Sequence, residues 1–450
     1  MEVRSKATGA ATLKLLRHRR GLSLAHMARS LLAQVPRTGL PRTAFPDVSG
    51  VQRSIARWES GKTAVLPSER YQLLLAHLYA RTPSGDLTIG PGSDFAELLD
   101  ALAHLGEGSA QLGQLRNAVV RAATDDGTGV LALLSPTMGA ALASALADPA
   151  RTDEELAHGL TEVVNNVNAQ VGSLSFVRLR LLLAPTVEAC RRLLSGPVPD
   201  HAAPTLRLAA LSAYTLAGRL AFETRDDTAS RALYAEATRT AGLWNQGWRR
   251  ATVHMSHALV TLYSAPDREQ ARRLVDAAVR DARSGESRLT RARAHALQAE
   301  IEGRAGHRRQ AESAMRLAWY DMEHARPDDD PSPGAFSAEH LRGFEGLCEL
   351  HVGDAEAAHD YFARSASALS HPRDSVQRAI VTADHALARV RLGDPQGAAG
   401  LLHECIGAAG ATGARVPAIR LRQVRRELRP WRQEAFFADL DDHLMDSLGL

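Results

Sequence analysis

The sequence predicts an all-α fold, and three observations lead to that prediction. Alanine, leucine, arginine and glutamate dominate the 450 residues, and aromatic residues make up only 5%, a mixture that favours helix because these side chains lose little freedom in it. Apolar residues recur at three- and four-residue steps along most of the chain. A turn signal also returns at steps of 40, 41 or 47 residues in the C-terminal half. We therefore expect a small helical bundle followed by an α-solenoid of helical hairpins.

The first two helices of the bundle are predicted on either side of a tight corner. Leucines 13, 15 and 16 stand among polar residues from Thr12 onward, and Gly21 is suited to end this helix in the left-handed conformation. Ser23 offers a side-chain oxygen as the N-cap of a second helix, which continues through Leu32 with apolar residues at helical spacing.

Two further helices complete the predicted bundle. Val51 to Trp58 forms one, with Ser49 as its expected cap and Val51 and Ile55 facing inward. Pro67 is expected in the first turn of the next helix, where its missing N–H costs nothing. Between the second and third helices, residues 33–48 insert a proline-rich segment that carries Arg37 and Arg42. We expect a solvated loop there, and the alternative is an arm that reaches a phosphate or a minor groove.

The C-terminal half repeats one helix-turn-helix pattern five times. Its turns are Arg225-Asp226, Pro266-Asp267, Gly306-His307, Gly353-Asp354 and Gly393-Asp394. Counted from the first residue of the turn, the position seven residues earlier is a small residue in four of the five copies. The position nine residues later is a large residue in all five. These pairs are Gly218 with Tyr234, Leu259 with Val275, Ala299 with Met315, Gly346 with Phe362 and Ala386 with Leu402. Small residues let paired helices approach closely while the large residue fills the gap between them.

Breaks in the helical pattern divide the chain into five predicted parts. Residues 1–80 form the bundle, and the glycine- and proline-rich residues 81–93 form a linker. Four or five helices follow in residues 94–201, as a connecting or dimerisation region. The repeats occupy residues 202–428, and the proline- and aspartate-rich segment 326–334 is expected to be a disordered loop between two of them. Residues 429–450 form a single capping helix, with one apolar face made of Phe436, Phe437, Leu440 and Leu444.

The charge of the chain is concentrated at its N-terminal end. Residues 1–80 hold thirteen lysines and arginines against four acidic residues, a net charge of +9, whereas the whole chain carries +3. A cationic head on a mildly acidic body indicates a polyanionic partner at one end. Chance clustering of basic residues is the alternative when no motif accompanies the charge.

Several classes of function find no support in the sequence. The three cysteines at 190, 348 and 405 are far apart and form no CxxC pair, so we expect neither a disulfide framework nor a zinc site. No phosphate loop, glycine fingerprint, HExxH or GxSxG motif occurs, so we expect no enzyme, no catalytic residue and no cofactor. No apolar run is long enough for a membrane span and no signal-peptide pattern occurs, which predicts a cytoplasmic protein without a membrane partner.

Two stretches of the chain resemble known families. Leu13 to Gly21, Ser23 to Ala28 and Ile55 to Gly61 resemble the helix-turn-helix of phage-repressor-type (XRE-family) regulators, and Trp58-Glu59-Ser60-Gly61 is the most specific piece. The five repeat copies are similar to tetratricopeptide repeats. The whole layout resembles actinobacterial regulators that fuse these two parts and, more distantly, the peptide-sensing regulators of Gram-positive quorum systems. The resemblance implies a sequence-specific regulator that binds double-stranded DNA, often as a homodimer, sometimes gated by a peptide, small-molecule or protein effector.

The resemblance also implies roles for individual residues. The helix that begins near Gly50 would lie in the major groove, where glutamine can pair with adenine and arginine with guanine. The base-contacting candidates are therefore Gln52, Arg53, Ser54 and Arg57. The phosphate-contacting candidates, at helix ends or in turns, are Arg17, Arg20, Ser23 and Lys62. The alternative for each of these cations is a solvated surface position, and Trp58 is expected in the core.

Effector-binding candidates lie outside the bundle. Asn165 and Asn168 share one predicted helix, and peptide sensors use asparagine side chains to hold a peptide backbone. Trp244 and Trp248 cluster at the start of a repeat helix, where they either line a concave face or pack between repeats. The competing function is a tetratricopeptide protein-interaction scaffold without specific DNA binding, in which the bundle is vestigial or dimerising. The charge of +9 on residues 1–80 favours the regulator, because a scaffold has no need of it.

Overall fold

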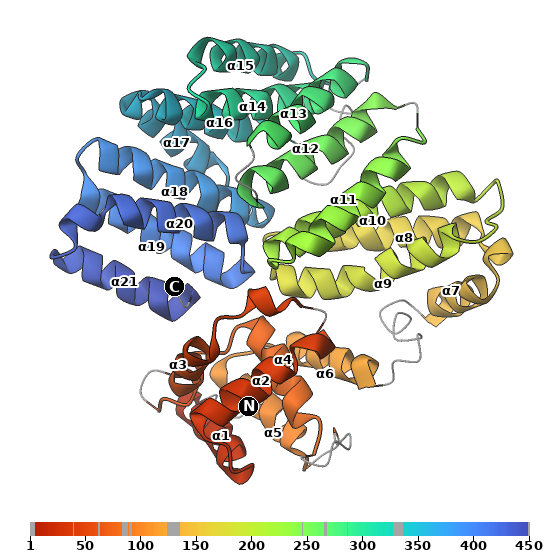
Figure 1. Ribbon diagram of the computed structural model, residues 1–450, viewed down its shortest axis with the longest axis vertical. Helices are drawn as coiled ribbons and strands as arrows, with labels where there is room; N and C mark the ends of the chain where they lie inside the picture. The colour runs from red at the N-terminus through yellow and green to blue at the C-terminus, as the bar shows by residue number, and fades with distance from the viewer. Residues whose placement is uncertain are drawn as a thin grey trace. The chain divides into compact units, whose positions relative to one another are not determined.

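The fold is all-helical, as the sequence predicts. A computed structural model of the chain describes residues 5–38, 40–61, 64–82, 89, 92–123, 136–244, 246–264, 268–285, 287–326 and 336–448. Over these residues it contains twenty-one α-helices, a few short 3₁₀ helices and no β-strand. The chain divides into two compact units, an N-terminal unit, Met1–Ala147, and a C-terminal unit, Asp148–Leu448. Figure 1 labels the helices of both units.

The N-terminal unit holds seven helices over the residues described: α1 (Lys6–Arg19), α2 (Leu24–Ala33), α3 (Val48–Trp58), α4 (Glu69–Tyr79), α5 (Asp94–Leu105), α6 (Ser109–Ala123) and α7 (Pro136–Ala147). Gly21 has a φ of +65°, and Ser23 caps α2 by accepting from the backbone N–H of His26 at 3.2 Å. Both predictions for this corner are therefore confirmed. The first helix begins six residues before the expected Thr12, because Ser5 supplies its cap.

The start of α3 differs from the prediction. Asp47, not Ser49, is the cap, because its carboxylate accepts from the backbone N–H of Gly50 at 2.7 Å. A carboxylate also suits the positive end of the helix dipole. Ser49 therefore lies within the first turn of the helix. Likewise, Pro67 precedes the cap of α4 at Ser68 and does not lie in the first turn.

The segment 33–48 is not the solvated loop that we expected. It forms two 3₁₀ turns, η1 (Val35–Thr38) and η2 (Arg42–Ala44), and buries four apolar side chains, those of Val35, Leu40, Ala44 and Phe45. The apolar residues between its prolines explain the difference, since burying each of them offsets the cost of ordering the backbone.

The N-terminal bundle continues beyond the boundary predicted at residue 80. A methyl group added at Gly9 of α1 would lie 2.6 Å from the carbonyl oxygen of Ala101, so α5 packs against α1 at backbone distance. Gln72 of α4 donates to Glu107 at 2.6 Å, immediately before α6. These two helices, assigned above to a separate connecting region, are therefore part of the same compact unit.

The C-terminal unit is a succession of packed helices, which Figure 1 shows from yellow to blue. Two helices lead into it, and six successive helix pairs follow. The leading helices and pairs are α8 (Glu154–Ala169), α9 (Phe176–Leu194), α10 (Ala203–Glu223) with α11 (Asp227–Ala241), α12 (Gly247–Ser264) with α13 (Arg268–Arg283), α14 (Arg288–Arg304) with α15 (Arg308–Glu323), α16 (Ala338–Val352) with α17 (Ala355–Ala368), α18 (Ser375–Arg391) with α19 (Pro395–Thr412), and α20 (Arg415–Glu427) with α21 (Ala435–Leu448).

The predicted turns lie between the paired helices wherever the structure describes them. Glycines 306, 353 and 393 have φ between +79° and +99°, and Arg225 takes the same left-handed role at +65°. Asp226, Asp354 and Asp394 follow, and each accepts from the backbone N–H three residues later. A left-handed residue thus ends one helix and an aspartate caps the next. Pro266-Asp267 and most of the predicted loop at 326–334 lie outside the described residues.

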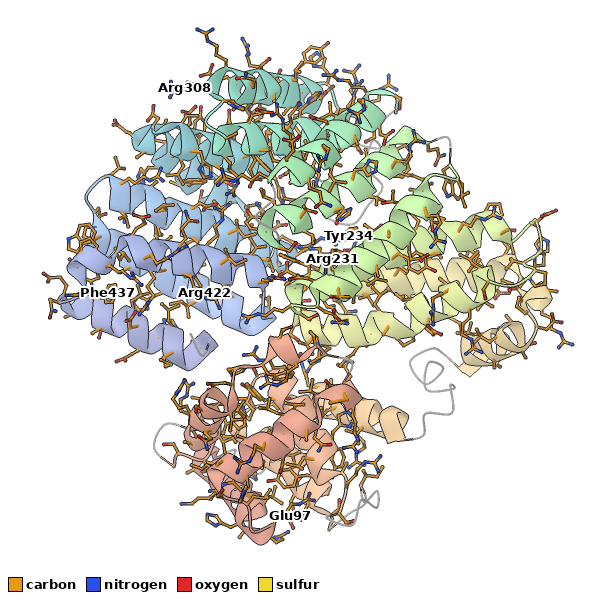
Figure 2. The ribbon with its side chains drawn as sticks, viewed as in Figure 1. Glu97, Arg231, Tyr234, Arg308, Arg422 and Phe437 are labelled. Carbon is orange, nitrogen blue, oxygen red and sulfur yellow. The ribbon has the colours of Figure 1, made fainter. Side chains whose placement is uncertain are left out.

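The small-to-large pairing of the repeats is visible in two of them. A methyl group at Gly218 would lie 3.0 Å from the ring of Tyr234, and one at Gly346 would lie 2.8 Å from the ring of Phe362. Both rings are buried, and Figure 2 labels Tyr234 on α11. The glycines therefore set how closely these helix pairs pack.

The C-terminal unit curls until its last helices meet its first. The backbone N–H of Arg415, at the start of α20, donates to Glu223 of α10 at 2.7 Å, and its guanidinium pairs with Asp227. Ser375 donates to the carbonyl of Gly172 at 2.8 Å. The predicted capping helix begins at Ala435, after a 3₁₀ turn at Arg429–Trp431, and buries three of its four expected apolar residues, Phe437, Leu440 and Leu444.

Candidate nucleic-acid interface

Helix α3 has one buried and one exposed face. Val51, Ile55 and Trp58 are buried, with at most 6% of any of them exposed. The Trp58 ring packs edge-on against Tyr71 of α4 with 4.9 Å between ring centroids. The expected core position of Trp58 is confirmed. This inner face holds α3 against the rest of the N-terminal unit.

The opposite face of α3 is where the base-contacting candidates lie. At 100° per residue, Ser49, Gln52, Arg53 and Ala56 fall on one continuous stripe, and three of these four are exposed. Gln52 is half-buried at the edge of the stripe. We call these four residues the α3 stripe. Ser49 was not among the predicted contacts because it was expected as the cap, and Ala56 was not because its small side chain carries no polar signal.

The other two base-contacting candidates are less well placed. Arg57 is half-buried, beside the stripe. Ser54 lies toward the buried side of α3, and its hydroxyl donates to the carbonyl of Gly50 one turn earlier at 3.2 Å. A hydroxyl bonded to its own helix and turned away from the stripe is poorly placed to reach a base.

The chain that leads into α3 is held in place by backbone-directed arginines. Arg42 donates to the carbonyls of Phe45 and Pro46 at 3.0 and 2.9 Å, and Arg70 of α4 donates to that of Ala44 at 2.7 Å. The first turn of α3 packs closely against the residue before its cap, because a methyl group at Gly50 would lie 2.8 Å from the Pro46 side chain. The entry into α3 is therefore ordered by hydrogen bonds and close packing.

No protein-family model matches the chain, and no curated protein matches it in sequence. The family resemblance therefore stays a prediction, and the geometry of the two units is what bears on function.

Two of the expected phosphate contacts have internal partners instead. The Arg17 guanidinium donates to both Glu59 oxygens, at 2.8 and 2.6 Å, and to the carbonyl of Leu22 at 2.8 Å. The hydrogen bond to Glu59 raises the pKa of Arg17. Arg20 donates to Asp94 at 2.8 Å and to the carbonyl of Leu78 at 2.9 Å. We withdraw both arginines from the phosphate set, because their side chains are buried and their donors are in use.

Of the remaining phosphate candidates, only Ser23 lies within the described residues. Ser23 is exposed at the start of α2, and its oxygen accepts from the backbone while its hydroxyl hydrogen can still donate outward. Lys62 lies outside the described residues. Arg29, an exposed cation on α2, was not singled out in the sequence analysis, because no motif marks it.

The effector-binding candidates of the C-terminal unit form no common site. Asn165 is exposed on α8, and Asn168 accepts from Arg373 at 3.4 Å. Trp244 and Trp248 stand at the start of α12, and their rings lie 5.4 and 4.5 Å from the guanidinium carbon of Arg249. The half-buried tryptophans therefore contact a cation of the chain itself.

The structure adds three observations on metal ligands, membrane-crossing helices and cysteines. Within the described residues, no three histidine, cysteine, aspartate or glutamate side chains gather as metal ligands would, and no described helix combines the length and apolarity needed to cross a membrane. The three cysteines are buried, and burial raises the pKa of Cys190 and Cys405 to about 12. These thiols are poor nucleophiles at neutral pH.

Proposed function

We propose that this protein is a sequence-specific transcription regulator that binds double-stranded DNA through α3. The observation that carries the proposal is the α3 stripe, three exposed residues and the half-buried Gln52 on a helix whose other face is packed in the core. A helix is the element that fits the major groove of DNA.

The composition of the α3 stripe suits base recognition. Gln52 offers a donor and an acceptor to adenine, and Arg53 offers two parallel donors to guanine. Ala56 leaves room for the helix to approach the base edges and can contact a thymine methyl group. Arg57, beside the stripe, completes the proposed base-reading set, from which we omit Ser54.

The charge of the first eighty residues supports the same proposal. A net charge of +9 favours approach to a polyanion and release of its counterions. With Arg17 and Arg20 withdrawn, the proposed phosphate contacts are Ser23, Arg29 and Lys62. Such contacts set the position of the helix on the duplex, whereas the stripe reads the sequence.

The C-terminal unit has the proposed role of controlling the DNA-binding part. Its curved array of helix pairs offers long surfaces for a peptide, small-molecule or protein effector, or for a second copy of the chain in a homodimer. A cytoplasmic location belongs to the same proposal, since that is where a bacterial regulator meets DNA.

The test begins with selection of duplexes from a random DNA library by the full-length protein. We expect one enriched motif whose binding constant falls linearly with salt on a log–log plot, because phosphate contacts release counterions. Variant R53A should lose preference at one base position. If no duplex is bound in a salt-sensitive way, the regulator proposal is wrong and the protein-interaction scaffold replaces it.

A further inference from the structure

A cleft of about 330 Å³ lies along the α15–α16 boundary of the C-terminal unit. One stripe of α15, one stripe of α16 and a tyrosine from α17 line it: Arg308, Ala311, Glu312, Met315, Arg316 and Trp319, then Glu345, Cys348, Glu349 and Val352, then Tyr361. Figure 2 labels Arg308 at the outer margin of the helix array. None of these residues was predicted from the sequence to have a role beyond repeat packing. We call this the α15–α16 cleft.

The floor of the cleft is apolar and its aromatic wall is fixed. Ala311, Met315 and Cys348 are buried beneath it. The Trp319 indole N–H donates to Glu345 Oε1 at 2.7 Å, which holds the ring in place. An apolar floor with a few oriented polar groups is typical of small-molecule sites.

Two carboxylates face this apolar floor. Glu345 and Glu349 lie one turn apart on α16, and both are half-buried. Burial raises the pKa of each, because the charged form loses water that no cation replaces in full. Two arginines also line the cleft, both at exposed positions. Arg308 faces Glu312 at 4.0 Å, and it lowers the pKa of Glu349 by less than burial raises it.

Carboxylates near the cleft raise the pKa of two neutral acids that line it. The pKa of Tyr361 is raised, first by the charge of Glu345 and then by burial and Glu349. The pKa of Cys348 is raised by burial and further by Glu300, Glu349 and Glu345. For both acids the nearby carboxylates raise the pKa, and an arginine, Arg364 for Tyr361 and Arg304 for Cys348, lowers it by less.

We propose that the α15–α16 cleft binds a small organic amine, with its ammonium group between Glu345 and Glu349 and its apolar body over Met315 and Cys348. The guanidinium carbon of Arg342 lies 6.0 Å from the centroid of the Trp319 ring, so Trp319 already contacts a cation of the chain. Tyr361 would flank the ligand, where its ring face attracts a cation. A volume near the lower end of ligand pockets fits a molecule of this size better than a protein segment. The proposal concerns the C-terminal unit alone and does not depend on DNA binding.

The chemistry of the cleft selects a cation over other ligands. An ammonium donates three hydrogen bonds. Its positive charge also stabilises the charged form of the two carboxylates, which burial disfavours. A neutral molecule of the same shape would leave both carboxylates as they are. An anion would add a third negative charge to the same place.

The test is calorimetric titration of the full-length protein, without DNA, at pH 7 with benzylammonium and with benzyl alcohol, its neutral counterpart of the same shape. We expect the ammonium to bind at least tenfold more tightly than the alcohol. The double variant E345Q/E349Q should lose at least tenfold in affinity for the ammonium, while E323Q/E356Q, with substitutions at exposed positions outside the cleft, should bind as the parent does.

Two results would overturn the proposal: equal binding of ammonium and alcohol, or unchanged binding by E345Q/E349Q. If that double variant unfolds, the affinity of E349Q alone for the ammonium is measured instead and should also fall. E349Q leaves the hydrogen bond from Trp319 to Glu345 intact. A lysine tripeptide with blocked ends that binds more tightly than benzylammonium would overturn the assignment to a small molecule. Since no DNA is present, failure here leaves the role of α3 untouched.

Discussion

Arg17 and Glu59 form a buried two-pronged ion pair between residues 42 positions apart in sequence, with bonds of 2.8 and 2.6 Å. Only 8% of either side chain is exposed. The pair joins the last turn of α1 to the residue that ends α3. Glu59 belongs to the Trp58-Glu59-Ser60-Gly61 motif, so that motif residue has a structural role here, in fixing the orientation of α3.

Replacing Arg17 with alanine should destabilise the N-terminal unit by about 3 kcal/mol, because Glu59 would stay buried without its partner. Denaturant unfolding followed by circular dichroism measures the loss. The double variant R17M/E59L should cost less than the sum of the two single changes, since it removes both charges together. Additive losses would contradict a direct pairing.

Gly346→Ala should destabilise the C-terminal unit by roughly 1 to 3 kcal/mol, because the new methyl group would lie 2.8 Å from the buried Phe362 ring. Gly400→Ala on α19 is the matched control. Nothing lies within 4 Å of a methyl group there, so the better helix propensity of alanine should stabilise by up to about 1 kcal/mol. Thermal melts of the two variants should therefore shift in opposite directions, and a downward shift for both would contradict this account.

Arg53→Ala and Lys62→Ala should affect DNA binding in different ways, if the proposed function holds. Loss of Arg53 should relax preference at one base position by about 1 to 3 kcal/mol, because a paired donor set to guanine is gone. Loss of Lys62 should weaken all duplexes alike and flatten the salt dependence. Titrations of matched duplexes at several salt concentrations separate the two. Equal losses on every duplex for both variants would refute the assignment.

Local signals in the sequence were enough to predict the fold. The turns of the repeats follow from a left-handed residue and an aspartate cap, as at Gly353 and Asp354, and the glycine-to-ring contacts follow from fixed spacing around those turns. These are interactions within one helix pair. They can therefore be predicted from the regular spacing of residues along the sequence.

Long-range partners could not be predicted in the same way. Nothing local shows that Arg17 pairs with Glu59, or that Arg20 pairs with Asp94 across 74 positions. Both arginines therefore looked like free surface cations. The α15–α16 cleft was missed for the same reason, because it forms only when stripes from two different repeats meet.

Acidification should destabilise the N-terminal unit through His77. Burial, with help from Arg37 and Arg81, lowers its pKa to about 4, while an unfolded histidine has a pKa near 6.5. As the pH falls from about 6.5 to 4, the unfolded chain binds this proton first, and stability is lost over that range by roughly 3 kcal/mol.

The variant H77L should lose this part of the pH dependence. Unfolding free energies at pH 7 and pH 4.5 measure it, and H26L, which changes an exposed histidine of α2, is the control. The C-terminal unit has buried histidines of its own, so only the difference between variants isolates His77. If H77L shows the same loss of unfolding free energy between pH 7 and pH 4.5 as the parent, the pKa of His77 is not lowered by folding, and its imidazole is charged in the folded protein at pH 4.5.

Arg420 lies at the centre of a buried polar network in the C-terminal unit, and its two carboxylate neighbours should respond unequally to its loss. Its guanidinium donates to Tyr263 at 2.8 Å and lies 3.4 Å from Asp384 and 3.9 Å from Glu300. Glu300 keeps a second partner, Arg304, at 2.7 Å. Among the residues that the structure describes, Arg420→Met would leave Asp384 without a cation in direct contact, and should cost about 3 kcal/mol.

Asp384→Asn should be much milder, because burial raises the pKa of this carboxyl in spite of the two arginines nearby. The site therefore stabilises the charge poorly, and an amide of the same shape should cost less than about 1 kcal/mol, while Arg420 keeps Tyr263 and Glu300 as partners. Denaturant unfolding of the two single variants decides the matter. Equal costs would mean that the ion pair of Arg420 with Asp384, and not the rest of the network, is what holds α18 and α20 together.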